Sequence, residues 1–245
     1  MDINSKTIKI TIGIIIVAIF FVSMYVIFNK KPRNPSLENI PNTDQGTGVV
    51  KREFKIVAFG DSLTAGFNVP LKDSYPSILE DILNNSREYK EYDVTFKVIN
   101  MGVSGETTSG GLDRIDFVIE QKPDLILLGL GANDMLRNTD PAFIRSNIDS
   151  VIQKIISSQT PLILLGMQSV ASNGREYKRD FDSIYPTLAR KYDLPLVPFF
   201  LDGVALKSAF NTADGIHPNR QGYEEIVNEN ILPVLRPSLK QILGL

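Results

Sequence analysis

Residues 54–66 read FKIVAFGDSLTAG, and this stretch decides the class of fold. Its first half, residues 54–59, is a short apolar run of the kind that forms a strand buried on both faces of a sheet. Its second half places two glycines around an Asp-Ser pair, which is typical of a tight turn. A buried strand that runs directly into a polar turn indicates an α/β protein with its chemistry at the end of the strand.

Four more apolar runs follow, with the spacing of about 30–40 residues that βαβ units require. They are residues 94–99, 124–130, 161–167 and 194–200. Helical patterns lie between these runs and after the last one, over residues 75–85, 111–121, 141–158, 177–192 and 221–235. Strands that alternate with helices in this way predict a three-layer α/β/α sandwich around a central, parallel, five-stranded sheet.

Glycine-bearing turns follow the first three strands. Ser62 lies in the first turn, Gly105 in the second and Asn133 in the third. A fourth segment, residues 214–219 (DGIHPN), precedes the last helix and holds His217, the only histidine of the chain. Because the carboxyl ends of parallel strands share one edge of the sheet, we expect these groups to meet there.

The groups at this edge can attack a carbonyl carbon. A serine hydroxyl is a weak nucleophile until an adjacent base takes its proton, and an imidazole suits that task near neutral pH. Asp214 precedes His217 by three residues, so its carboxylate can reach the second ring nitrogen. The backbone N–H groups of Ser62 and Gly105 and the carboxamide of Asn133 can stabilise a tetrahedral oxyanion. We therefore expect Ser62, Asp214 and His217 to be catalytic and Ser62, Gly105 and Asn133 to form an oxyanion hole.

Two acidic residues flank these motifs, Asp61 before Ser62 and Asp134 after Asn133. Short polar side chains at such turns commonly cap helices. We expect both carboxylates to support the turns through hydrogen bonds and to take no direct part in the chemistry. Substrate specificity is expected to depend on the loops at residues 64–74, 134–142 and 168–180.

Composition excludes several other kinds of site. The 245 residues include no cysteine, which excludes a disulfide framework, a thiolate metal site and a cysteine nucleophile. A single histidine excludes any site with two imidazoles. The sequence contains no P-loop, no dinucleotide-binding glycine motif after the first strand, no D-x-D-x-D-G calcium loop and no G-x-S-x-G elbow. We expect neither a cofactor nor a metal.

The charge of the chain argues against nucleic acid as a partner. Residues 1–51 hold six of the 26 basic and three of the 28 acidic side chains, so the remainder carries a net charge of about −5. A negative domain without basic clusters is a poor candidate for binding nucleic acid.

Four blocks of this sequence together resemble the SGNH (GDSL-type) hydrolases: residues 60–66 (GDSLTAG), 104–106 (SGE), 131–134 (GAND) and 214–219 (DGIHPN). The resemblance spans residues 54–235 and extends to the bacterial arylesterase, acyl-CoA thioesterase and lysophospholipase branch. It implies an SGNH, flavodoxin-like fold, Ser62 as nucleophile, Gly105 and Asn133 as oxyanion donors, and Asp214–His217 as the acid–base pair. Glu106 stands where that branch often has Asp, a change that we expect to be harmless.

The most hydrophobic part of the chain lies near its N-terminus. Residues 10–28 (ITIGIIIVAIFFVSMYVIF) are 19 consecutive positions without a charge. As a helix they are about 28 Å long, close to the roughly 30 Å of a bilayer core. Residues 29–51 are rich in Pro, Gly and Asn, which is typical of an extended linker. We expect a short N-terminal flank at 1–9, a transmembrane signal anchor at 10–28, a polar linker at 29–51 and an SGNH hydrolase domain at 52–245.

This arrangement predicts the location of the protein. We expect a single-pass anchor in the cell membrane, with the catalytic domain outside the cytoplasm. The alternative is a cleaved secretory signal and a secreted protein, although the apolar run is longer than the usual signal core of about 7–15 residues. Basic residues flank the run on both sides, so the charge bias does not decide the orientation.

The expected function is that of a serine esterase. It hydrolyses carboxylic ester or thioester bonds of acyl substrates through an acyl-Ser62 intermediate, in the manner of an arylesterase, thioesterase or lysophospholipase. A deacetylase of carbohydrate or peptidoglycan could use the same residues, and a catalytically silent, membrane-tethered binding module could keep the fold without the reaction. The expected partners are a small-molecule acyl ester or thioester and the membrane, through residues 10–28, while protein partners remain open.

Overall fold

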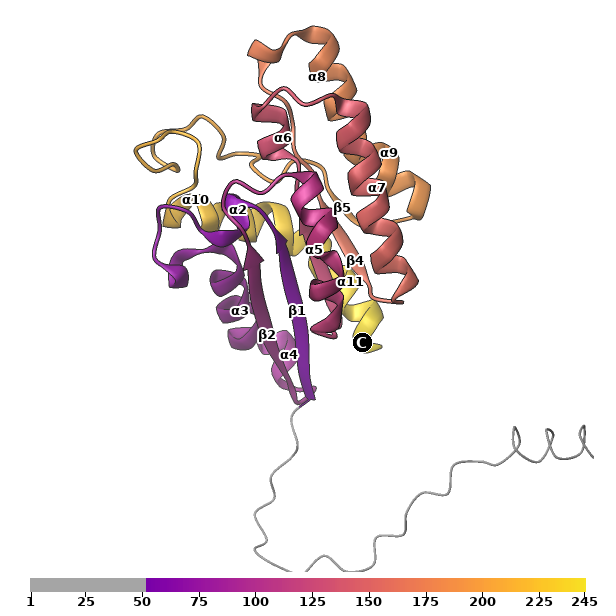
Figure 1. The fold of residues 1–245 in the computed structure, drawn as a ribbon. Helices are drawn as coiled ribbons and strands as arrows, with labels where there is room; N and C mark the ends of the chain where they lie inside the picture. The colour runs from indigo at the N-terminus through magenta and orange to yellow at the C-terminus, as the bar shows by residue number, and fades with distance from the viewer. Residues whose placement is uncertain (1–51) are drawn as a thin grey trace, which may run out of the picture. The chain divides into compact units, whose positions relative to one another are not determined.

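The computed structural model describes residues 52–245, which form a parallel sheet with helices on both of its faces (Figure 1). The sequence-predicted flank at 1–9, anchor at 10–28 and linker at 29–51 lie outside the described residues. Within residues 52–245, no helix combines the length and the apolar character that crossing a bilayer requires.

The five predicted strands are confirmed, and they run parallel in the order β2-β1-β3-β4-β5. Their bounds are β1 Arg52–Gly60, β2 Val94–Gly102, β3 Leu125–Gly129, β4 Leu162–Leu165 and β5 Leu196–Val197. In the pairing register, Gly60 of β1 lies beside Gly102 of β2 and Gly129 of β3. The three strands therefore end at the same level, and the turns that follow them start side by side.

The helices cover both faces of this sheet. The α-helices are α2 Ser62–Ala65, α3 Tyr75–Asn85, α4 Arg87–Lys90, α5 Thr108–Glu120, α6 Ala132–Leu136, α7 Pro141–Ser157, α8 Arg175–Asp182, α9 Ile184–Tyr192, α10 Arg220–Glu225 and α11 Leu232–Leu243. Short 3-10 turns occur at η1 Leu71–Asp73 and η2 Ala171–Asn173, and a π-helical turn at η3 Ile226–Ile231. In Figure 1, α5 and α7 lie on one side of the sheet and α3, α10 and α11 on the other. The distribution of these helices follows from right-handed crossover connections. The chain passes outward from β1 to β2 and then returns past β1 to β3, so the helices of these two connections lie on opposite faces of the sheet.

The predicted single helix over residues 177–192 is wrong. The structure has two helices there, α8 and α9, which are separated at Ser183. Pro186 lies in the first turn of α9, where a missing N–H costs nothing, but its ring would clash with the carbonyl of Asp182 in one continuous helix.

The last predicted helix, residues 221–235, begins one residue earlier and continues through α10, η3 and α11 to Leu243. Pro233 has no N–H to donate to the preceding turn, and the widened π-helical turn η3 lies directly before α11, where this proline sits. The fifth strand is also shorter than predicted. Pro195 and Pro198 flank the two residues of β5, and a proline cannot donate a ladder hydrogen bond.

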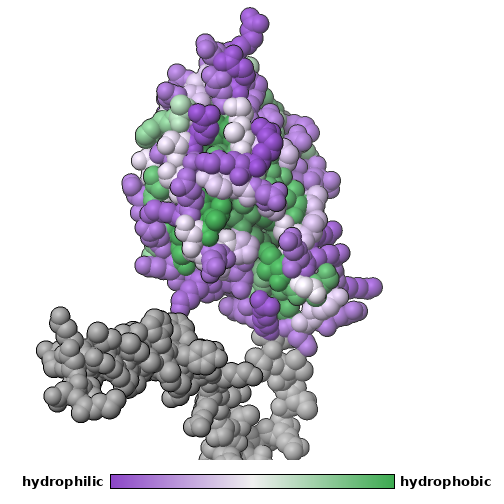
Figure 2. Space-filling view, turned by 90° about the vertical axis from the view of Figure 1, so that its right-hand side faces the viewer, coloured by the Kyte–Doolittle hydropathy of each residue, from purple (hydrophilic) through white to green (hydrophobic). Residues whose placement is uncertain are grey.

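The core lies against both faces of the central strands. Consecutive side chains at residues 56–59 of β1 and 125–128 of β3 are all buried, as expected for strands covered on both sides. The face shown in Figure 2 is largely hydrophilic, with smaller hydrophobic areas between the polar side chains.

Candidate active site

Ser62 is held at the carboxyl end of β1, where it is the first residue of the short helix α2. The carboxylate of Asp61 caps this helix by accepting a hydrogen bond of 3.0 Å from the backbone N–H of Leu63. The turn is tightly packed, since a Cβ atom at Gly60 would collide with the carbonyl oxygen of Gly129. A glycine before Asp61 therefore lets the chain turn against the neighbouring strand end.

Asp214 and His217 lie in a loop that is closed by its own hydrogen bonds. An isolated antiparallel bridge joins Asn211 to Pro218 at its base, and the N–H of Thr212 donates to the carbonyl of His217 at 2.8 Å. Within the loop, Asp214 Oδ1 accepts from the backbone N–H groups of Ile216 and His217, at 3.0 Å each. The loop thus fixes the carboxylate beside the imidazole before any substrate binds.

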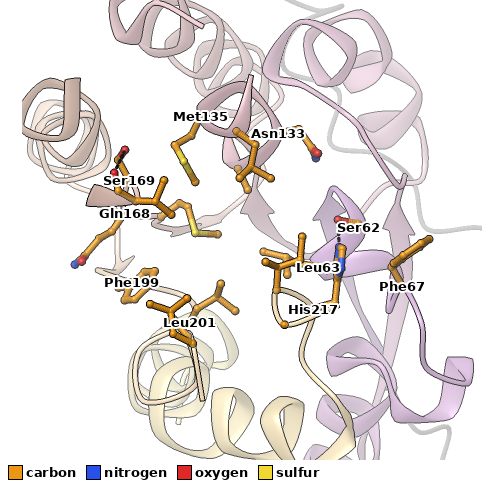
Figure 3. Close-up of a pocket in the computed structure, with 18 of the residues that line it drawn as sticks. Ser62, Leu63, Phe67, Asn133, Met135, Gln168, Ser169, Phe199, Leu201 and His217 are labelled. Atoms are coloured by element: carbon orange, nitrogen blue, oxygen red, sulfur yellow. Dashed lines mark hydrogen bonds between the residues drawn. The ribbon is translucent and has the colours of Figure 1, made fainter. Parts of the chain in front are cut away.

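The structure brings the three predicted catalytic residues together in one chain of hydrogen bonds. His217 Nε2 lies 2.9 Å from Ser62 Oγ, and His217 Nδ1 lies 2.7 Å from Asp214 Oδ2 (the Ser62–His217 contact is dashed in Figure 3). An Nδ1–H that donates to the carboxylate leaves Nε2 free to accept the serine proton. The ring of Phe67 lies 4.8 Å from the imidazole, centroid to centroid, and packs against it.

The surroundings of Asp214 favour the ionised form of its carboxyl group. Partial desolvation opposes its charge, but hydrogen bonds from the backbone N–H groups of His217 and Ile216 outweigh it, with help from the side chains of His217 and Thr212. Together they hold the pKa of Asp214 well below its usual range. A carboxylate in this state can orient His217 and stabilise the imidazolium that forms during proton transfer.

The predicted oxyanion donors lie on the neighbouring strand ends. Gly105 adopts φ +81°, a left-handed conformation that glycine favours, and it lines the same cavity as Ser62 and Asn133. Over residues 52–245, neither the N–H of Ser62 nor that of Gly105 donates a hydrogen bond. Asn133 Nδ2 donates one of its two protons to the carbonyl of Glu106 at 2.9 Å, which orients the carboxamide and leaves the second proton for a ligand.

An ion pair that sequence reasoning missed supports this arrangement. Arg114 of α5 binds both carboxylate oxygens of Glu106, and it also donates to the carbonyl groups of Gly60 and Met101. The Glu106 side chain is only 6% exposed. One guanidinium therefore ties together the ends of β1 and β2 and the turn that carries Gly105. The eight-residue separation of Glu106 and Arg114 gave no periodic signal that could have revealed the pair.

Asp134 and Asp61 have the supporting roles expected from the sequence. The buried Asp134 carboxylate accepts hydrogen bonds from the backbone N–H and the hydroxyl of Thr108, at 2.8 and 2.7 Å, and so joins α6 to α5. Asp61 is 2% exposed, and burial is the main cause that raises the pKa of its carboxyl group to about 7.

The serine and histidine open into a cavity of about 520 Å³ that is lined mainly by apolar side chains. In Figure 3, Ser62 and His217 lie at one side of the cavity, with Gln168, Ser169 and Phe199 at the opposite side. All three predicted specificity loops contribute lining residues, among them Phe67, Leu136 and Val170. Four residues that follow β5 also line the cavity, Phe199, Leu201, Ala205 and Leu206. Sequence reasoning missed this contribution because Phe199 was predicted to belong to the fifth strand and no motif marks the other three.

A parallel α/β sheet with a linked Ser-His-Asp set at its carboxyl edge defines a serine hydrolase. The comparison with protein families agrees with this class. The chain belongs to the GDSL-like Lipase/Acylhydrolase family, whose model matches residues 58–225, and it is a serine esterase of that family.

Several characterised proteins are similar to this chain. An arylesterase of Vibrio mimicus is 39% identical over 165 residues, which cover 67% of this chain and 80% of the relative. The Escherichia coli K12 protein named thioesterase 1/protease 1/lysophospholipase L1 is 33% identical over 166 residues, 67% of this chain and 76% of the relative. Among solved structures, AlinE4, an SGNH-hydrolase family esterase, is 39% identical with a TM-score of 0.61, covering 76% of this chain and 97% of the other.

Proposed function

We propose that Ser62, His217 and Asp214 are the catalytic triad of an esterase that acts on acyl esters and thioesters. The observation that carries this proposal is the pair of hydrogen bonds of 2.9 and 2.7 Å that links the three side chains at the wall of an apolar cavity. Such a relay both activates a serine and holds its base in one tautomer.

The first half of the reaction acylates the serine. Ser62 Oγ attacks the carbonyl carbon while His217 Nε2 takes the hydroxyl proton. The carbonyl oxygen becomes an oxyanion, which accepts hydrogen bonds from the N–H groups of Ser62 and Gly105 and from Asn133 Nδ2. When the tetrahedral intermediate collapses, His217 returns the proton to the leaving alkoxide or thiolate, and the acyl group stays on Ser62.

The second half releases the acid. His217 takes a proton from a water molecule, whose oxygen attacks the acyl carbon of the ester on Ser62. The same three donors stabilise the second tetrahedral intermediate. His217 then gives the proton to Ser62 Oγ, the bond between Oγ and the acyl carbon breaks, and a carboxylic acid leaves. No group other than water is consumed, and the enzyme returns to its starting state.

The cavity favours an acyl chain over a sugar as the part of the substrate that binds beside Ser62. Its lining is mainly apolar, with Met135, Met167, Phe199 and Leu201 among the contributors. A sugar acetate would place several hydroxyl groups against these side chains without hydrogen-bond partners, which is costly. The names of the relatives, arylesterase and thioesterase/lysophospholipase, support the same substrate class.

We also propose that the hydrolase domain, residues 52–245, is held outside the cytoplasm by a membrane anchor at residues 10–28. The support is the 19-residue uncharged run and the polar linker that follows it. Fractionation of cells that produce the full chain tests this proposal. The protein should stay with the membrane after an alkaline wash and be degraded by a protease added to intact spheroplasts. Recovery in the culture medium would instead indicate signal cleavage.

The triad is tested with Ser62→Ala in the full chain and with Ser150→Ala as a matched control, since Ser150 is a partly exposed serine on α7 that does not line the cavity. Ser62→Ala should lose at least about 10³-fold in kcat on a short-chain nitrophenyl ester and should not react with a fluorophosphonate probe. Wild type and Ser150→Ala should both hydrolyse the ester and label. Labelling of Ser62→Ala with retained turnover would overturn the assignment.

A further inference from the structure

The mouth of the cavity is surrounded by exposed apolar side chains. Phe67, Leu136, Val170, Leu206 and Ile216 all line the cavity, yet between 38% and 87% of each residue's surface is exposed. They come from four separate segments of the chain: the turn after α2, the end of α6, the loop after β4 and the long connection between β5 and α10, which holds both Leu206 and Ile216. Single exposed apolar residues are ordinary, but a ring of them around one opening marks an interaction surface.

Leu206 shows that this exposure is not an accident of packing. The residue is 87% exposed and adopts φ +62°, a left-handed conformation that is rare for a leucine. A backbone held in that region costs on the order of 1–3 kcal/mol. Packing in the core does not offset this cost, because the Leu206 side chain is exposed to solvent. Strain of this kind is concentrated at functional positions.

A basic residue follows each of the two rim leucines. Arg137 follows Leu136 and Lys207 follows Leu206, and both basic side chains are exposed. Within residues 52–245, neither forms an ion pair with a carboxylate: Arg137 donates to the carbonyl of Gly105, and Lys207 lies over the ring of Phe210. In a domain of net negative charge, two cations without acidic partners beside an apolar rim are complementary to an anionic surface.

We infer that this rim docks the enzyme onto an anionic lipid bilayer. Phe67, Leu136, Val170, Leu206 and Ile216 enter the boundary between headgroups and acyl chains, while Arg137 and Lys207 lie at the level of the lipid phosphates. The mouth then faces the lipid, and an acyl chain can pass into the cavity without crossing water. The choice of lipid as the partner rests on the proposed function, whereas binding of the rim to a bilayer is tested without measuring catalysis.

The length of the chain before the domain is compatible with this orientation. β1 begins at the edge of the sheet opposite the site and has nine residues, so it covers about 30 Å. The 23 residues at 29–51 can extend over at most about 80 Å. A membrane anchor at 10–28 therefore does not prevent the mouth from reaching the same bilayer.

The absence of tryptophan from the chain makes a direct test possible. Leu206→Trp and, separately, Leu136→Trp each introduce a single fluorophore at the rim of the full chain. The matched control is Phe117→Trp, because Phe117 is 57% exposed and lies near the carboxyl end of α5, the end away from the mouth. All three chains keep residues 1–51, so a difference between them reports the rim and not the anchor.

The proteins are mixed with vesicles of phosphatidylglycerol and phosphatidylcholine. At the rim, tryptophan emission should shift to shorter wavelength and be quenched by lipids brominated in their acyl chains, and at position 117 neither change should occur. Equal behaviour at both sites would overturn the inference. A concentration-dependent shift without lipid would also overturn it, because the rim would then be a contact between copies of the chain.

A pair of charge reversals separates docking from the general charge of the protein. Lys207→Glu in the Leu206→Trp chain should lose most of the quenching, since each basic residue near an anionic surface contributes about 1 kcal/mol, or roughly fivefold. Lys122→Glu makes the same change in net charge in the loop after α5, at the opposite edge of the sheet, and should leave the quenching unchanged. An equal loss of quenching in Lys207→Glu and Lys122→Glu would contradict a contact that is specific to the rim. Because neither readout needs turnover, an inactive enzyme that still docks would reject the proposed function and keep this inference.

Discussion

Asn68 donates a hydrogen bond of 2.8 Å to the carboxylate of Asp214, which lies 146 residues later in the chain. The acceptor is Oδ2, the same oxygen that accepts from His217 Nδ1. Asn68 adopts φ +66°, a left-handed conformation that asparagine tolerates better than most residues. Because Phe67 packs against the imidazole, two consecutive residues hold both members of the Asp214–His217 pair.

We predict that Asn68→Gly lowers kcat about three- to tenfold and leaves KM unchanged. Glycine keeps the left-handed backbone without strain, so the variant removes the carboxamide alone. The lost hydrogen bond is worth about 1 kcal/mol, and each 1.36 kcal/mol in the activation barrier changes the rate tenfold. Steady-state kinetics on a soluble short-chain ester measure both constants.

Asn138→Gly is the matched control for this variant. Asn138 is also an exposed asparagine with a left-handed backbone, at φ +55°, and its side chain does not contact the triad. Its replacement should leave kcat within error of the wild type. A rise in KM with an unchanged kcat, or an equal fall in kcat in both variants, would mean that Asn68 shapes the loop and does not position Asp214.

The second prediction concerns the oxyanion hole. Asn133→Ala should lose about 10²–10³-fold in kcat, the usual effect of removing one donor from such a site. Asn133→Asp should lose at least as much, because it keeps the shape of the side chain but replaces the N–H donor with an acceptor. Both are compared by kcat on the same ester, with circular dichroism to confirm the fold. A loss of less than tenfold in both would exclude Asn133 from the hole.

Much of this fold could be predicted from the sequence because its central strands are buried on both faces. Continuous apolar runs at residues 54–59 and 124–130 fit few structures other than a buried strand, and β1 and β3 are found at these positions. The predicted helix and strand bounds are wrong where a proline changes the structure through its ring and its missing N–H, which a pattern of hydropathy does not reveal. Pro186 divides one predicted helix into α8 and α9, and Pro195 and Pro198 limit β5 to two residues.

The residues of the site also fall into two groups: those that a local sequence motif identifies, and those that come together only when the chain folds. Ser62, Asp214 and His217 could be predicted because each sits in a short motif at a strand end or before a helix. Asn68 could not, because its partner is distant in sequence and no local pattern encodes that contact. The same holds for Phe199, which was predicted as part of the fifth strand, and for Leu201 and Leu206, which lie beyond it; all three line the cavity.

The third prediction concerns the length of the acyl chain. Phe199 lies across the cavity from Ser62 (Figure 3), so Phe199→Ala should lengthen the space available to a substrate. Each methylene that enters it contributes about 0.8 kcal/mol, or roughly fourfold in kcat/KM. A series of nitrophenyl esters of increasing chain length measures the shift toward longer chains. Phe143→Ala, at an exposed position on α7 outside the cavity, should show no such shift.

The fourth prediction follows from the buried carboxyl group of Asp61. Burial raises its pKa to about 7, while an unfolded chain has a value near 3.9. Between these two values the folded protein binds the proton more strongly than the unfolded chain does. The contribution of Asp61 to stability is therefore complete below about pH 4 and is lost as the pH rises toward 7.

Asp61→Asn should remove this dependence. Asparagine stays neutral and keeps an oxygen that accepts from the N–H of Leu63. Relative to the wild type, the variant should gain stability between pH 4 and pH 7, by up to about 4 kcal/mol if the whole shift is realised. Urea unfolding of both proteins at several pH values measures the difference, in which the contributions of the other carboxylates cancel. Asp61→Ala is the control for the cap, and its loss of about 1 kcal/mol should add to the same pH-dependent gain. Parallel curves for wild type and Asp61→Asn would show that Asp61 ionises in the folded protein as easily as in water.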